Sequence, residues 1–352
     1  MSRLHSHQEL ARIGTALFEA AGACTLEART QADALVQSSL MGHDSHGVLR
    51  IPEYLKDIEV GTLKPGASIE LSRTSPTTAI VDCGYNFGAV GGAQAMAAAV
   101  EIAREQRTAC VVTRRCSHVG RLGAYVQTAA DAGLIAIATC NSPIYGHFVL
   151  PWGGREGRLA TNPIAYGVPT SGDPIVADFS TSVAPEGKIR FYRNEGKDVP
   201  EGWILDADGN ATTDPRQFYG PPRGGILPLG GAAGHKGFAL GLLVEILGSA
   251  LAGVAPNDRT VLGNGVCLLV TDPSAFCPLE QFRRWVDQTI LYMKSSPPVP
   301  GVEEVLVPGE LEFRTMRRRV SEGIPVDEPT WKAIQQHAAK RHIDLELFGS
   351  QP

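Results

Sequence analysis

Hydrophobic and polar positions follow two different patterns along this chain, and the change between them falls near Gly61. Before it, Glu9 to Ala23 and Leu26 to Met41 carry apolar residues at helical spacing, which predicts two amphipathic helices. After it, short apolar or β-branched runs alternate with helical stretches, an order typical of an α/β protein. We therefore expect a central α/β part, with helical ends that pack together.

The second pattern predicts strands and helices in turn. The expected strands are 79–81, 109–113, 134–139, 164–168, 175–178 and 266–270, and the expected helices are 91–106, 122–132, 236–252, 279–294, 310–322 and 328–341. A long Pro- and Gly-rich connection, 196–234, interrupts this alternation. These elements divide the chain into an N-terminal helical part (1–75), a central α/β part (76–300) and a C-terminal helical part (301–352).

The longest apolar run, Phe238 to Ala255, is close to the length that spans a membrane. It contains Glu245 and several glycines, which a spanning helix would carry at a cost. We therefore expect a buried core helix here and no membrane partner.

Composition narrows the class of protein. The chain has 352 residues, of which 43% are apolar and 20% charged, enough apolar mass for a large core. The net charge is −5, and the one basic cluster, Arg317 to Arg319, lies in a helical stretch of mixed charge. A solvated helix face explains that cluster better than a nucleic-acid contact, so we expect no nucleic-acid partner.

The cysteines and the first residues indicate a cellular compartment. Seven cysteines is an odd number, and none forms a CxxC pair, which predicts reduced thiols and no zinc site. The stretch Met1 to Leu10 is polar and has no apolar core of a secretory signal. We expect a cytoplasmic protein without a bound metal.

One glycine motif is missing. A doubly wound dinucleotide-binding domain carries GxGxxG between its first strand and helix. Gly88, Gly91 and Gly92 come closest, but their spacing is wrong and no acidic residue follows at the expected distance. A dinucleotide would therefore have to bind to another fold.

The segment Gly42 to Arg50, GHDSHGVLR, places several ionisable side chains in a short turn bounded by glycines. Histidine exchanges protons near neutral pH, and the planar fork of arginine matches a carboxylate. The alternative is a capping turn, in which His43 and Asp44 satisfy backbone groups. The residues alone leave both interpretations open.

Two further segments suit chemistry or anion binding. Arg114 to Gly123 follows an expected strand and precedes a helix, a position where α/β proteins place reactive groups, and it contains His118. Gly230 to Gly237 runs into a helix, so its backbone amides and Lys236 suit a phosphate or carboxylate. Taken alone, the first is also explained as a surface turn, and the second is unspecific.

In their order and spacing, six segments together resemble the malate/L-lactate dehydrogenase family of the second type. The likeness runs from about His7 to Ala339. The segments that carry it are Gly42 to Arg50, Cys116 to Gly120, Thr161 to Gly167, Asp178 to Lys188, His235 to Glu245 and Pro308 to Glu310. The resemblance implies a non-Rossmann dinucleotide-binding fold with a central mixed sheet, a homodimer, and NAD or NADP as cofactor.

The resemblance also implies roles for individual residues. His46 and His118 become the acid/base candidates, with a slight preference for His46 as proton donor. Ser45 and Arg50 would position the substrate, and Arg50 would hold its carboxylate. Residues that would contact the cofactor or line the same site are Ser142, Asn162, Asp178, Phe179, Ser180, Thr181, Ser182, His235, Lys236, Pro308, Gly309 and Glu310, with Asn162 assigned to substrate.

The implied activity interconverts a small 2-hydroxy acid and its 2-oxo acid by hydride transfer. An alternative within the same fold is reduction of a cyclic imino acid, and a second is a binding protein without catalysis. The choice between NAD and NADP stays open, although Glu186 stands where the family varies and would repel a 2′-phosphate nearby.

Overall fold

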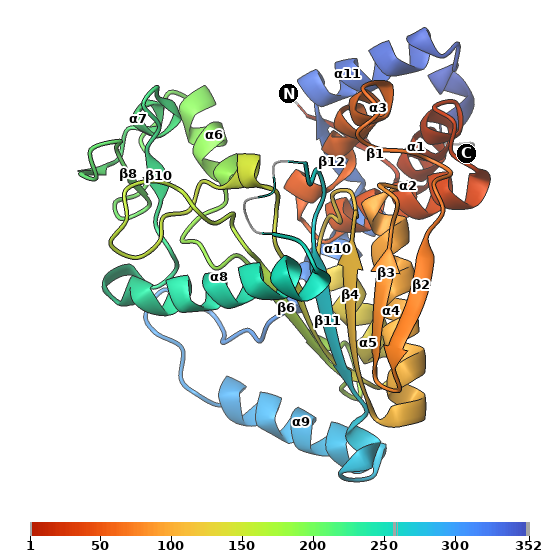
Figure 1. Cartoon of the computed structure of the whole chain (residues 1–352), viewed down its shortest axis with the longest axis vertical. Coiled ribbons are helices and arrows are strands. Elements are labelled where there is room, and N and C mark those ends of the chain that lie inside the picture. The colour runs from red at the N-terminus through yellow and green to blue at the C-terminus, as the bar shows by residue number, and fades with distance from the viewer. Residues whose placement is uncertain (1, 256–257, 259, 350–352) are drawn as a thin grey trace.

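A seven-stranded mixed sheet forms the centre of the computed structural model, which describes residues 2–255, 258 and 260–349 (Figure 1). Its strand order is β2-β3-β4-β11-β5-β6-β7, and only β3 and β4 run parallel to each other. The strands are β2 (Glu70–Ser75), β3 (Thr78–Asp82), β4 (Thr108–Arg114), β5 (Ile135–Cys140), β6 (Ile164–Val168), β7 (Ile175–Phe179) and β11 (Val266–Thr271). The late strand β11 lies between β4 and β5, so the loops that follow β4 and β5 and precede β11 meet at one end of the sheet.

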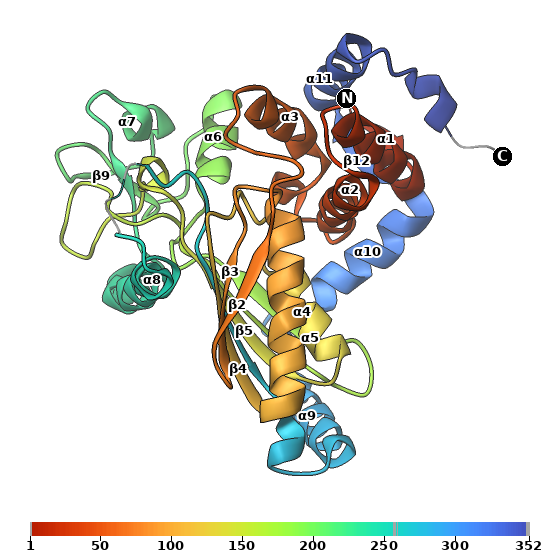
Figure 2. The ribbon, with the colours of Figure 1, turned by 45° about the vertical axis from the view of Figure 1, so that its right-hand side comes forward.

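Helices cover the two faces of this sheet unequally. On one face lie α4 (Gly88–Gln106) and α5 (Gly123–Asp131), and on the other lies α8 (Gly234–Gly248) (Figure 2). The first two helices and the sheet share one buried apolar cluster, which includes Met96, Val126 and Leu268. This cluster anchors the β4–α5 connection, which carries His118.

A separate helical layer joins the two ends of the chain. It contains β1 (Ser2–His5), α1 (His7–Glu19), α2 (Thr25–Leu40), α3 (Ile51–Glu59), α10 (Glu310–Glu322), β12 (Ile324–Asp327) and α11 (Glu328–Lys340). β1 pairs with β12, and Phe18, Tyr54 and Trp331 belong to one buried cluster. The predicted fold class, a central mixed sheet with packed helical ends, is confirmed.

The connection predicted at 196–234 forms part of a small satellite. It comprises α6 (Glu186–Asn194), β8 (Ile204–Leu205), β9 (Ala211–Thr212), α7 (Pro215–Tyr219) and β10 (Gly225–Ile226). Ile189, Ile204 and Phe218 form the centre of its own apolar cluster. The strands have two residues each, too short to leave a period in the sequence.

The expected core helix at 238–255 is α8, and it is less buried than predicted. Its large exposed side chains include Leu240, Leu242, Leu243 and Ile246, each 39–49% exposed. The stretch Gly231–Ala252 is the one candidate among the described residues that passes a membrane-span test of length and apolar composition; 39% of its most apolar window is buried. The remaining helix, α9 (Leu279–Lys294), has no buried residue and lies apart from the other helices in Figure 1.

Candidate active site

The turn Gly42 to Arg50 is folded tightly against α2 and α10. It consists of two short 3-10 turns, Asp44–His46 and Val48–Arg50, and the backbone N–H of Val48 donates to Ser39 Oγ at 3.1 Å. Gly47 leaves no room for a side chain, because a Cβ there would overlap Ser39. Arg319 of α10 donates to both carboxylate oxygens of Asp44, at 2.6 and 3.0 Å. These contacts give the turn a fixed position, but Asp44 holds it through the side chain of Arg319 and not by capping backbone groups, as the alternative interpretation expected.

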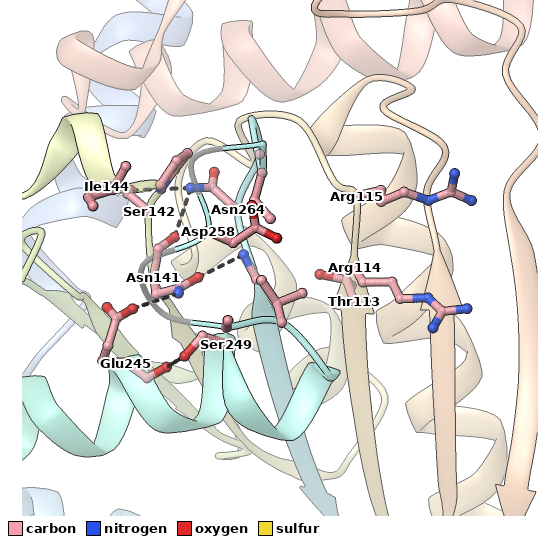
Figure 3. A pocket seen from close by; sticks show the side chains of 17 residues that line it. Thr113, Arg114, Arg115, Asn141, Ser142, Ile144, Glu245, Ser249, Asp258 and Asn264 are labelled. Carbon is pink, nitrogen blue, oxygen red and sulfur yellow. Dashed lines mark hydrogen bonds between the residues drawn. The ribbon is translucent and has the colours of Figure 1, made fainter.

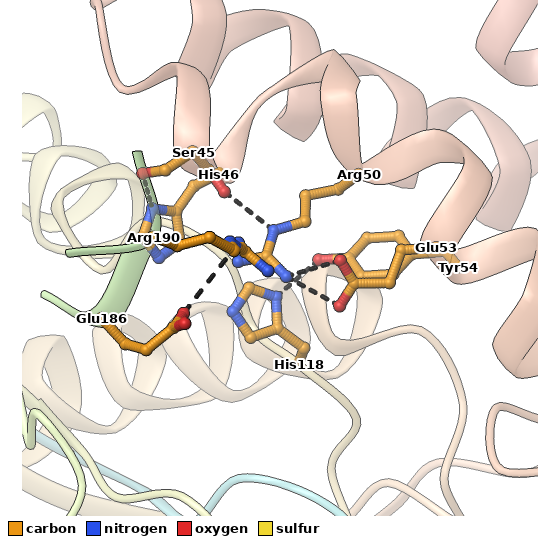
Figure 4. Close-up of polar contacts among 8 residues, drawn as sticks. All are labelled: Ser45, His46, Arg50, Glu53, Tyr54, His118, Glu186 and Arg190. Carbon is orange, nitrogen blue, oxygen red and sulfur yellow. Dashed lines mark hydrogen bonds and ion pairs between the residues drawn. The ribbon is translucent and has the colours of Figure 1, made fainter. Parts of the chain in front are cut away.

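His46 and His118, far apart in sequence, lie side by side. Their rings are nearly parallel, at 18°, with centroids 5.6 Å apart. Arg50 Nε donates to the backbone carbonyl of Ser45 at 2.8 Å, and Ser45 Oγ lies 3.0 Å from His46 Nδ1. Figure 4 shows these side chains converging from the Gly42 to Arg50 turn and the β4–α5 loop. The structure thus brings four of the predicted site residues together.

Tyr54 is a member of this centre that sequence reasoning missed. Its hydroxyl lies 2.6 Å from His118 Nδ1, and the side chain is only 2% exposed. A partner at Nδ1 fixes the ring and leaves Nε2 as the free nitrogen of His118. The helical spacing of Tyr54 on α3 explains it equally well as a core residue, so no local signal marked it.

The loop that carries His118 is also held on several sides. The backbone N–H of Val119 donates to Asn264 Oδ1 at 3.1 Å, and Cys116 forms a β-bridge with Asn264. At the start of α4, Gly88 allows the helix to touch the loop, since a Cβ there would overlap the backbone carbonyl of His118. The position of His118 is therefore determined by β4, α4 and the segment before β11.

Both histidines favour the neutral form. Burial, and then the positive charges of Arg50, His43 and Arg121, lower the pKa of His46 from 6.5 to about 4. Burial, and then Arg50 and His46, hold the pKa of His118 well below its usual range. Because positive charge lowers the pKa of both rings, the negative charge of a substrate carboxylate held beside them would raise both pKa values.

We expect this burial to make the protein less stable in acid. Unfolded chains protonate His46 near pH 6.5 and the folded chain only near pH 4, so the unfolded state binds more protons between these values. The free energy of unfolding therefore falls as pH falls through this window. We expect His46 to contribute a loss of about 2 kcal/mol between about pH 7 and about pH 5. Denaturant titrations at both pH values measure the loss, and His46→Gln should lose less than wild type. An equal loss in both proteins would contradict the depressed pKa.

Arg121 is a second site residue without a predicted role. It is 4% exposed, its Nε has no hydrogen-bond partner among the described residues, and burial lowers its pKa. It lines a cavity of about 420 Å³ between α2, α4 and α5, and His46 lines the same cavity. A buried cation with an unused N–H beside a cavity is suited to an anionic group.

Two groups of predicted cofactor residues lie at β7, and one of these residues, Asp178, is next to Arg121. Asp178 Oδ2 accepts from the backbone N–H of Gly123 at 2.7 Å, and the negative charge of Asp178 acts on Arg121. The backbone carbonyl of Pro308 accepts from Val176 N at 3.2 Å, which places Pro308 to Glu310 beside β7. Glu310 is paired with Lys294 at 2.6 Å, so its carboxylate is already satisfied within the chain.

The next predicted residues continue from β7 toward α8. Phe179 is 40% exposed, while Ser180 Oγ donates to the carbonyl of Ser182 at 3.0 Å. Thr181 and Ser182 are buried, and their hydroxyls donate to the carbonyls of Asn162 (2.9 Å) and Ala184 (2.8 Å). The free surface of this segment therefore comes from Phe179 and from the partly exposed Ser180.

His235 and Lys236 are exposed at the start of α8. The ring of His235 lies 5.9 Å from that of Trp152. The segment before α8 touches the predicted cofactor residues that follow β7, because Leu229 N donates to the carbonyl of Thr181 at 2.9 Å. His235 and Lys236 therefore follow a segment that touches the predicted cofactor residues, and neither contacts His46 or His118.

Asn162 and Ser142 belong to a buried polar network. Asn162 Nδ2 donates to Gly241 O (2.9 Å) and Glu245 Oε2 (3.0 Å), and Asn141 Nδ2 donates to Glu245 Oε1 (3.2 Å). Ser142 Oγ accepts from Asn264 at 3.2 Å, beside a cavity of about 20 Å³ (Figure 3). The network joins α8 to the loops that follow β5 and precede β6 and β11. Asn162 makes no contact with His46 or His118, so its role toward substrate stays a prediction.

Comparison with known proteins places this chain in a family. The family model for malate/L-lactate dehydrogenase matches residues 5–335. The chain is 38% identical to malate dehydrogenase of Pyrococcus horikoshii over 90% of both chains, and 32% identical to hydroxycarboxylate dehydrogenase B of Escherichia coli K12 over 91% of this chain and 89% of that one. The solved delta1-piperideine-2-carboxylate reductase from Pseudomonas syringae is 28% identical, with a TM-score of 0.82 over 96% of this chain and all of that one.

The chain is a dehydrogenase by class, as the resemblance predicted. It belongs to the malate/L-lactate dehydrogenase family. The predicted type of enzyme, a hydroxycarboxylate dehydrogenase, is confirmed with it. The relatives' names vary in substrate, so they do not name the acid on which this chain acts.

Proposed function

We propose that this chain interconverts a small 2-hydroxy acid and its 2-oxo acid with a nicotinamide cofactor, and that His118 moves the proton. The observation that carries the proposal is the convergence of His46, His118 and Arg50 on one centre beside the cavity lined by Arg121. An acid/base group and a carboxylate-binding fork are what a 2-oxo acid requires.

Arg121 at the cavity and two segments at β7 fit parts of a dinucleotide. A bound nicotinamide cofactor would supply the hydride, while this chain binds, orients and protonates the substrate. Arg121, with its unused Nε, suits one of the cofactor phosphates. Asp178 to Ser182, and Pro308 to Glu310 beside Val176 of β7, are proposed to hold the rest.

The roles at the reacting centre follow from the contacts. Arg50 holds the substrate carboxylate, whose negative charge beside the two rings favours the protonated form of histidine. His118 donates from Nε2 to the substrate oxygen in reduction, because Tyr54 holds Nδ1. After donation, Nδ1–H remains hydrogen-bonded to the Tyr54 oxygen, so the neutral ring needs no rearrangement.

The proposed cofactor is tested by thermal unfolding with NADH and with NADPH. A ligand at about a hundred times its Kd stabilises the folded state by about 2.7 kcal/mol, a shift of several degrees in Tm. We expect one of the two to give this shift and Arg121→Met to reduce it, while Arg158→Met, which removes an exposed arginine paired with Glu156, should leave it unchanged. No shift with either dinucleotide would count against the proposal.

Reduction of a cyclic imino acid is a second candidate. The structural likeness to the piperideine-carboxylate reductase favours it, since the residues proposed to bind the carboxylate and donate the proton would also serve an imine.

We further propose that the chain forms a homodimer, supported by the row of exposed aliphatic side chains on α8. The cytoplasm remains its proposed location.

A further inference from the structure

The hydrogen bonds of Arg50 leave one nitrogen of its guanidinium group without a partner among the described residues. A guanidinium has five N–H groups, one on Nε and two on each terminal nitrogen. Nε donates to the carbonyl of Ser45, and Nη1 lies 2.7 Å from both carboxylate oxygens of Glu53. Only Nη2 has no partner among the described residues.

A carboxylate that binds an arginine in bidentate geometry needs two adjacent nitrogens of the guanidinium group. One such edge combines Nη2 with Nε, and the other combines Nη2 with Nη1. The first edge is obstructed by the backbone of Ser45, which belongs to the tightly held turn. The second is obstructed by the Glu53 side chain, which is 50% exposed, whereas Arg50 is 20% exposed. Only the Glu53 edge can be cleared by rotating a side chain into water.

We propose that Glu53 is an internal competitor for Arg50, which the substrate carboxylate displaces when it binds. The inference rests on the proposed function and adds a residue that sets the affinity for substrate. Arg50 stays paired with a carboxylate before and after the exchange, so its charge is never left uncompensated. The free enzyme also presents a weaker site to chloride and other simple anions, because Glu53 already occupies the fork.

The test compares Glu53→Gln with Glu59→Gln in steady-state reduction of a 2-oxo acid. Both residues lie on α3 and both variants remove one negative charge, but Glu59 pairs with Lys340 and Arg341, each at 2.9 Å. Glu53→Gln should lower KM by about two- to fivefold, the range expected for release of a partly exposed ion pair, with kcat nearly unchanged. Glu59→Gln should leave KM unchanged. Inhibition by chloride should strengthen in Glu53→Gln alone.

A second background makes the assignment specific to Arg50. In an Arg50→Ala protein, Glu53→Gln should have no further effect on KM, because the competition has been removed. A KM that rises or stays constant in Glu53→Gln overturns the inference; a rise would mean that Glu53 orients Arg50 for substrate.

A wild-type protein that reduces no substrate would defeat the proposed function and would leave the competition measurable. Oxalate binding by calorimetry, in wild type, Glu53→Gln and Glu59→Gln, then replaces KM. Tighter binding in Glu53→Gln alone supports the competition, and equal binding in all three overturns it.

Discussion

His118→Ala is expected to lower kcat for reduction of a 2-oxo acid by about 10²- to 10⁴-fold, the range for loss of a positioned acid/base group. His118 is the ring that the fold holds most firmly, through Tyr54 at Nδ1 and through the contacts of its loop with Asn264 and Gly88. Because the cavity and Arg121 are untouched, the affinity for cofactor should change little. Single-turnover rates and cofactor titration measure the two effects separately.

His46→Ala provides the matched comparison. Among the described residues its ring has a single hydrogen-bond partner, the exposed Ser45 Oγ, so we expect a smaller fall in kcat than in His118→Ala. Tyr54→Phe should fall between them, by about 10- to 100-fold, the usual effect of losing a partner that orients a functional histidine. A larger fall in His46→Ala than in His118→Ala would show that His46 is the donor.

The second large effect is expected at Arg50. Arg50→Ala should raise KM for a 2-oxo acid by about 100-fold, since hydrogen bonds to a charged group contribute about 1.5–3 kcal/mol. The same change removes a positive charge that lowers both histidine pKa values, so the pKa of His46 should rise toward its ordinary value. Steady-state kinetics and histidine NMR titration measure the two results.

Arg158→Ala is the control, because it removes an exposed arginine that is paired with Glu156. Its KM should match that of wild type. Arg50→Lys should recover only part of the affinity, because an ammonium cannot make two parallel hydrogen bonds to one carboxylate. An unchanged KM in Arg50→Ala would remove Arg50 from the proposed role.

Periodicity predicted the long elements well and the short ones poorly. The helices predicted at 279–294 and 310–322 match α9 and α10, because their patterns extend over many residues. β2 was missed: its six residues, Glu70 to Ser75, are all exposed and mostly polar, so they carry no alternation. β2 also lies within the predicted N-terminal helical part, yet it pairs with β3 of the central sheet.

Burial was harder to predict than helix formation. The pattern of α8 is apolar on every side, which indicated a core helix, but several of its leucines are exposed. The sequence of a helix cannot show which of its apolar faces is buried against the rest of the protein and which is exposed, because both faces of α8 carry the same kinds of side chain. The tertiary arrangement of α8 over only part of the sheet decides the difference.

Some residues of the candidate site were likewise predicted from the sequence, and others were missed. His46, His118, Ser45 and Arg50 were predicted from short motifs, and the structure brings them together. Tyr54 and Arg121 were missed as site residues, because their relevance depends on a contact with His118 and on burial beside a cavity. Asn162 was assigned to substrate, but its amide nitrogen is bonded to Gly241 and Glu245, contacts that only tertiary structure reveals.

The most direct test of the central claim is an assay of the purified protein with NADH or NADPH against 2-oxo acids and cyclic imines. Loss of the reduced-cofactor absorbance measures turnover, and the recovered product identifies the reaction. The account predicts turnover of at least one 2-oxo acid to its 2-hydroxy acid, with a rate that His118→Ala reduces by orders of magnitude. Turnover of imines alone, or of no substrate in a protein that binds neither dinucleotide, would contradict it.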